Sequence, residues 1–121
     1  MTKYTYITLS NAADDRHDEF NEWYTNVHIV DVVNQVPGVV SAQRFQLAPV
    51  QRREPPHPWR YLAIYQIDTE DLQATMRSLQ ELSGSPAMPV SDSFDPKHLA
   101  LVFEAISPAV RNPAVADLTA E

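Results

Sequence analysis

The 121-residue chain contains no cysteine and only two glycines, and each shortage excludes whole classes of site. Without cysteine there is no disulfide, no thiolate metal site and no cysteine nucleophile. With glycine only at positions 38 and 84, the chain lacks the Gly-rich loops that hold nucleotide phosphates, and it has no Gly-x-Ser-x-Gly motif. It also lacks His-x3-His and a pair of Glu-x2-His motifs. We therefore predict no metal site and no cofactor.

Basic residues and long apolar runs are also scarce. Sixteen acidic residues against nine basic ones give a formal net charge of −7, which opposes binding to nucleic acid and to anionic membranes. No segment approaches the ~20 apolar residues of a membrane span. The N-terminal sequence MTKYTYITLS lacks the apolar run and cleavage site of a signal peptide. We expect a soluble, cytoplasmic protein.

The hydrophobic residues, 44% of the chain, recur at periods that predict strands and helices. Alternation of β-branched and aromatic residues predicts four strands, at residues 3–10, 39–47, 59–67 and 98–106.

A period of three to four residues predicts two helices. The first begins at a cap formed by Asp14 or Asp15 and stops at Pro37-Gly38, and the second is capped by Thr69. The resulting order, β-α-β-β-α-β, is that of an α+β, ferredoxin-like domain with a four-stranded antiparallel sheet. We predict that residues 1–108 form this single domain and that 109–121 form a C-terminal arm or tail.

Two helices cover only one face of such a sheet, yet both faces of its strands are apolar. The third predicted strand places Tyr61, Tyr65 and Ile67 on one face and Leu62 and Ile64 on the other. An apolar face of this kind is not left in water. We therefore predict a homodimer in which a second copy covers the face.

The first predicted helix carries polar groups within its apolar stripe. One face holds residues at helical spacing, with Trp23 and Val30 widening the stripe: Phe20, Tyr24, Val27, His28, Asp31 and Gln35. A stripe that only packs against a sheet has no need of a histidine and an aspartate one turn apart. This conflict marks the helix as the candidate site.

The same helix supports a resemblance to a known family. The pattern Phe20-x3-Tyr24-x3-His28, followed by Pro37-Gly38 and a strand beginning at Val39, resembles the EthD-like branch of the dimeric α/β barrel superfamily. The resemblance covers roughly the first 48 residues. It implies that two ferredoxin-like subunits pair into a barrel and that His28 lines a pocket between helix and sheet. The chain departs from the pattern in having Ile29-Val30-Asp31 where many members have Gly-Pro.

A histidine in such a pocket can take or give a proton near neutral pH. Asp31 can hold one ring nitrogen of His28 and so set its tautomer, which makes the pair a general base suited to a proton beside a carbonyl. Alternatively, the nitrogens of His28 bond to backbone or to Asp31 and only anchor the helix. The family resemblance favours the catalytic interpretation.

Other polar and aromatic residues can serve the same pocket or the core. Tyr24 can donate its hydroxyl to a developing oxyanion, although a tyrosine there is more often a core residue. Tyr65 and Tyr6 can form an aromatic wall for a planar substrate or pack at the dimer interface, and Phe20 and Trp23 are candidates for the same wall. Arg44 either grips a carboxylate or phenolate of the substrate or pairs with an acidic residue.

The function that we predict is a cofactor-independent cyclase, isomerase or lyase. It would use His28 as acid/base on an aromatic, polyketide-like or cyclic carbonyl compound, with cofactor-free monooxygenation as a variant. The alternative is a non-catalytic dimeric protein that binds a small hydrophobic ligand, or an accessory protein that binds a partner, without turnover. We expect the irregular stretches 49–58 and 85–97 to border the pocket mouth.

Overall fold

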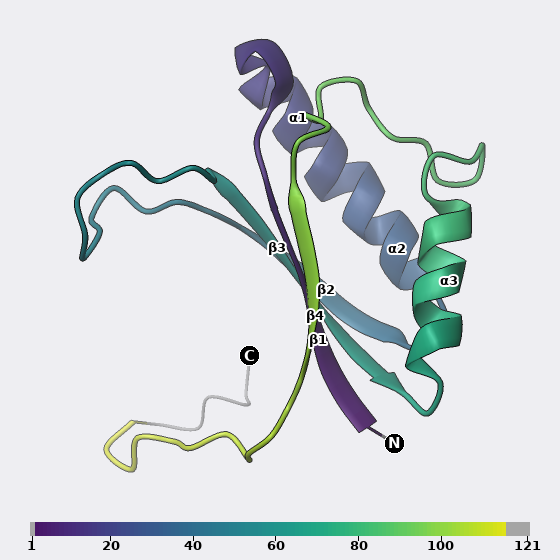
Figure 1. Ribbon diagram of the computed structural model, residues 1–121, viewed down its shortest axis with the longest axis vertical. Coiled ribbons are helices and arrows are strands. Elements are labelled where there is room, and N and C mark those ends of the chain that lie inside the picture. Colours follow the sequence, from purple (N-terminus) through teal and green to yellow (C-terminus); the bar gives the residue numbers. More distant parts are fainter. Residues whose placement is uncertain (1, 116–121) are drawn as a thin grey trace.

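The computed structural model describes residues 2–115. Within them the chain forms a sheet flanked by helices (Figure 1). The strands are β1 (Thr2–Ser10), β2 (Val39–Gln46), β3 (Tyr61–Thr69) and β4 (Leu99–Glu104). The helices are α1 (His17–Trp23), α2 (Ile29–Gln35) and α3 (Leu72–Leu82), with a π-helical turn, Tyr24–His28, between α1 and α2.

The four strands lie in the order β2-β3-β1-β4, and every neighbouring pair is antiparallel. All helices lie on one side of the sheet (Figure 1). This arrangement confirms the predicted α+β, ferredoxin-like fold. Within the described residues no helix is long and apolar enough to cross a membrane.

The core lies between the sheet and the first helical segment. Phe20, Tyr24 and Val32 from the helices are at most 3% exposed, and they pack against alternate residues of β3. The buried residues of β3 are Tyr61, Ala63, Tyr65 and Ile67. The predicted division of this strand into two faces is therefore confirmed, with the tyrosines on the helix side.

The apolar stripe of the first helix differs from the predicted one. Val27 and Val30 were expected in the stripe, but they are 39% and 46% exposed. The reason is the π-helical turn at Tyr24–His28, which adds a residue to one turn and so rotates the later residues relative to an uninterrupted α-helix. Val32 and Val36 then become the buried residues of the second half.

Both predicted N-caps were wrong, and the predicted helix stop was right. Asp14 and Asp15 have positive φ angles of 51° and 57° in a short 3-10 turn, and α1 begins only at His17. Thr69 is the last residue of β3, and the carboxylate of Asp71 caps α3 by accepting a 3.0 Å hydrogen bond from the Ala74 N–H. Gly38 ends the first helical segment with φ 95°.

The two irregular stretches extend to opposite sides of the sheet (Figure 1). Residues 47–60 form an arm that leaves the sheet on the side without helices. Residues 83–98 return from α3 to β4 along the helices. The predicted arm at 109–121 lies partly outside the described residues, and its described part contains neither helix nor strand.

The face of the sheet away from the helices is apolar across all four strands. The register aligns two rows of side chains across the strands: Phe45, Leu62, Leu9 and Leu99 in one, and Gln43, Ile64, Ile7 and Leu101 in the other. Leu101 is 43% exposed and Phe103 is 51% exposed. No helix of the described residues covers these rows (Figure 1).

Candidate functional site

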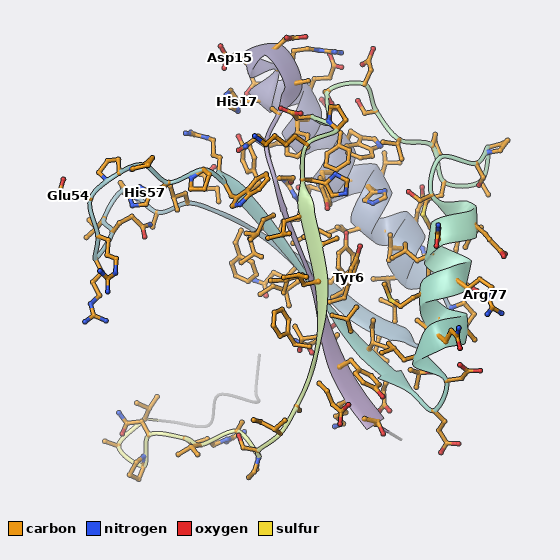
Figure 2. The ribbon with its side chains drawn as sticks, in the orientation of Figure 1. Tyr6, Asp15, His17, Glu54, His57 and Arg77 are labelled. Atoms are coloured by element: carbon orange, nitrogen blue, oxygen red, sulfur yellow. The ribbon has the colours of Figure 1, made fainter. Side chains whose placement is uncertain are left out.

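A cavity of about 550 Å³ lies between the sheet and the helices. It brings together four of the predicted site residues: Tyr6, Tyr24, His28 and Tyr65. Figure 2 shows Tyr6 on the helix side of the sheet, where β1 faces the helices. The apolar part of the wall includes Val32, Met76, Leu79 and Phe94. The cavity is therefore apolar with a few hydroxyl and imidazole groups, as is usual for a small-molecule site.

The hydroxyl groups form one hydrogen-bonded cluster. The hydroxyls of Thr8 and Tyr24 are 2.8 Å apart, and Tyr65 donates to the Tyr24 hydroxyl at 3.4 Å. The ring of Tyr6 lies 5.4 Å from that of Tyr65. Burial, with a smaller effect of Tyr24, raises the pKa of Tyr6 to about 12, and burial also raises the pKa of Tyr65 well above its usual value. Tyr6 and Tyr65 therefore stay protonated at neutral pH and remain hydrogen-bond donors.

His28 lies at the end of the π-helical turn, among aromatic rings. Its ring stacks on Trp23 with centroids 4.9 Å apart and meets the Tyr24 ring edge-on at 5.1 Å. Nδ1 is buried and has no hydrogen-bond partner in the described residues. Burial lowers the pKa of His28 to about 4, and the charge of Asp31 opposes the shift. His28 is therefore a neutral imidazole at neutral pH.

Asp31 acts on His28 through its charge alone. Within residues 2–115 no hydrogen bond or ion pair joins the two side chains, and Asp31 does not line the cavity. The predicted hydrogen bond from a ring nitrogen of His28 to Asp31 is therefore not formed in this structure.

Arg44 lies on β2, beside the first helical segment. It does not line the cavity, and no carboxylate among residues 2–115 forms an ion pair with it. Instead Nη1 donates to the Thr25 hydroxyl at 2.9 Å, and the guanidinium lies 4.6 Å from the centre of the Tyr24 ring. Phe20 and Trp23 are also outside the cavity lining, and both pack around Tyr24.

Several cavity residues were missed by the sequence reasoning. Thr8 was detectable, because it shares a strand face with Tyr6. Phe94 comes from the 83–98 connection, which confirms that 85–97 borders the pocket. The stretch 49–58 contributes no lining residue, so that expectation was wrong: it belongs to the arm on the other side of the sheet (Figure 1).

His98 lies immediately before β4. It is exposed, and it also lines the cavity, because β4 pairs with β1 and brings the first residues of β4 beside Thr8. Its Nδ1 lies 2.9 Å from the Pro96 carbonyl oxygen, so Nδ1 carries the proton in that hydrogen bond. Within the described part of the chain, no three histidine or acidic side chains are grouped as metal ligands.

Comparisons with solved structures show where else this fold occurs. An EthD family protein from Bacillus halodurans is 19% identical, with a TM-score of 0.58, and the match covers 88% of this chain and all of that one. A candidate monooxygenase from Shewanella loihica is 16% identical, with a TM-score of 0.56 and coverage of 88% and 97%. A dimeric ferredoxin-like protein of unknown function from Thermobifida fusca is 12% identical, with a TM-score of 0.57 and coverage of 86% and 92%. The chain therefore has the fold of EthD-like, ferredoxin-like proteins.

One curated protein matches in sequence. Core atranone cluster (CAC) protein 1 from Stachybotrys chlorohalonatus is 41% identical over 69 residues, which are 56% of this chain and 25% of that protein. The match thus spans about a quarter of the length of this curated relative. No family model matches the chain.

Proposed function

We propose that the protein is a cofactor-independent enzyme that transfers a proton on an aromatic, polyketide-like or cyclic carbonyl compound. The observation that carries the proposal is His28, which lines the cavity beside the hydroxyl cluster while no hydrogen bond to residues 2–115 anchors its ring. A histidine that only fixes the helix would be expected to have its buried nitrogen paired, because an unpaired buried polar atom costs about 1–3 kcal/mol. The interpretation as a structural anchor is therefore disfavoured.

The chemistry follows from the neighbours of His28. The neutral imidazole takes a proton from the carbon beside a substrate carbonyl, and the C–H electron pair forms a C=C bond while the carbonyl π pair moves to oxygen. Tyr24, which accepts the hydroxyl hydrogen of Tyr65, donates its own hydrogen to that oxygen as it gains charge. A base with a pKa of about 4 is weak, so the phenol donors must supply much of the driving force. The enolate then cyclises, isomerises or eliminates, according to the substrate.

The relative from the atranone cluster supports a biosynthetic role. Its name places it in a core gene cluster, and 69 residues of this chain match it. We propose that the two proteins act on small organic compounds in biosynthesis. Monooxygenation is the variant that the Shewanella loihica structure suggests. Molecular oxygen as co-reactant would take up the enolate's electron pair to form a C–O bond, and the hydroperoxide, protonated by the imidazolium, would lose water with the remaining α-hydrogen to leave a new carbonyl.

We further propose that the working unit is a homodimer. Two rows of side chains on the helix-free face, apolar except for Gln43, lie open in the single chain, and the Thermobifida fusca protein of this fold is dimeric. Burial of Leu101 and Phe103 against a second copy would remove them from water and close the two sheets into a barrel.

Deuterium exchange tests the proposed reaction without knowledge of the product. Wild-type protein is incubated in D₂O with a panel of enolisable aromatic and cyclic carbonyl compounds, and loss of the α-proton is followed by NMR. We expect H28N to slow the exchange by about 100-fold or more, because general-base catalysis contributes on that scale. Ligand affinity should change much less, since the apolar walls remain.

The matched control is H57Q. His57 lies on the arm, away from the helices (Figure 2), so this variant should exchange at the wild-type rate. Tight binding without any accelerated exchange would support the alternative, a ligand-binding protein. Exchange that survives in H28N would show that His28 is not the base.

A further inference from the structure

Arg44 is a half-buried cation packed against aromatic rings. Its guanidinium lies between β2 and the helix, against three aromatic rings, at 4.6 Å from Tyr24, 5.3 Å from Phe20 and 5.4 Å from Tyr61. The shortest of these distances is to Tyr24, which the proposed function makes a hydrogen-bond donor to the substrate. Arg44 itself is outside the cavity, so it contacts the substrate only through Tyr24.

The hydrogen bonds of Arg44 do not account for its burial. Nη1 donates to Thr25 and, at 3.4 Å, to the backbone oxygen of Asn21. Nε and Nη2 are buried with no partner in the described residues. Unpaired buried donors on a cation are costly, and no carboxylate among residues 2–115 compensates. Within residues 2–115, the negative faces of the three aromatic rings add to the two hydrogen bonds of Nη1 in offsetting the charge.

We propose that Arg44 is a positioning residue that acts through Tyr24, stabilising negative charge on this phenol as it donates its hydrogen to the substrate oxygen. The inference rests on the donor role of Tyr24 in the proposed function. A cation held against an aromatic ring attracts a phenolate more strongly than a neutral phenol, so Arg44 makes Tyr24 a better donor. Burial lowers the pKa of Arg44, and the tyrosines, Tyr24 first among them, oppose this effect, as a mutual attraction requires.

Among the described groups around Tyr24, Arg44 carries the positive charge. The other titratable groups that face this phenol are His28 from its own helical segment, Tyr6 from β1 and Tyr65 from β3. The imidazole is neutral at neutral pH, and Tyr6 and Tyr65 remain protonated. At 4.6 Å from the centre of the ring, the guanidinium of Arg44 is placed to favour negative charge on Tyr24.

The test compares kcat and KM in the deuterium-exchange assay. We expect R44M to lower kcat by about 10-fold or more with little change in KM, because the charge acts through Tyr24 in the transition state, whereas R44K keeps the charge and part of the rate. In a Y24F background R44M should have little further effect, because the phenol through which Arg44 acts is gone. The matched control is R60M, because Arg60 lies on Tyr61 at 5.9 Å and not on Tyr24.

A loss of kcat on R44M that is equally large in wild type and in Y24F, or no loss in wild type, would overturn the proposal. If R44M does not fold, R44K and R44Q give the same comparison, because only the first keeps the charge. In the exchange assay, R44Q should lower kcat with little change in KM, and R44K should restore part of the rate. Exchange by the wild type with no effect of R44M would overturn this inference and leave the proposed function standing, whereas no exchange by the wild type would refute the proposed function.

Discussion

The desolvated imidazole of His28 makes the stability of the protein depend on pH. Burial lowers its pKa from 6.5 to about 4, which corresponds to about 3 kcal/mol at 1.36 kcal/mol per pKa unit. The unfolded chain, with the higher pKa, binds the proton first as the pH falls. The free energy of unfolding therefore holds its full value above pH 6.5 and decreases as the pH falls toward 4. The loss of about 3 kcal/mol is an upper value, since partial exposure of the ring reduces it.

Urea unfolding at several pH values between 7 and 4, at one protein concentration, measures this loss. H28Q has no group to titrate at this position. From pH 7 to pH 4 the free energy of unfolding of the wild type should therefore fall by about 2–3 kcal/mol relative to that of H28Q. H57Q is the control and should keep the wild-type profile. Parallel wild-type and H28Q profiles would refute the reasoning, because they would show that His28 titrates alike in the folded and unfolded chains.

Two further outcomes test the dimer and the role of Asp31. L101K places a charge on the helix-free face and should raise the dimer dissociation constant by about 100-fold in sedimentation, whereas V90K, on the helix side, should leave it unchanged. D31N removes the charge that opposes the desolvation of His28, so an NMR titration should find the His28 pKa below its wild-type value of about 4. An unchanged pKa in D31N would mean that Asp31 does not act on the imidazole.

Much of the fold could be predicted because local pattern and tertiary packing agree. The alternation of Tyr61, Ala63 and Tyr65 with Leu62 and Ile64 identifies both the strand and its two faces, and the structure buries the first set. Helix starts were less predictable. Several side chains near the start of a helix can act as its N-cap. For α3 the choice between Thr69 and Asp71 depends on where β3 ends.

The site was predictable in part. Tyr24 and His28 share a helix face, and Tyr6 and Tyr65 share the sheet face opposite, so the pattern alone brings them to one layer. Arg44 could not be placed in this way. Whether a mid-strand arginine reaches a carboxylate, a ligand or an aromatic ring depends on which helix residues lie above it, and no periodicity states that.

The π-helical turn explains why the state of His28 is not visible in the sequence. In an uninterrupted α-helix, residues five apart point about 140° away from each other, so Trp23 and His28 would not meet. A π-helical turn pairs residues five apart, and the two rings stack at 4.9 Å. The stack helps to remove His28 from water, and burial is the main cause of its low pKa. The chemistry that we propose thus depends on one helical irregularity that only the packed structure reveals.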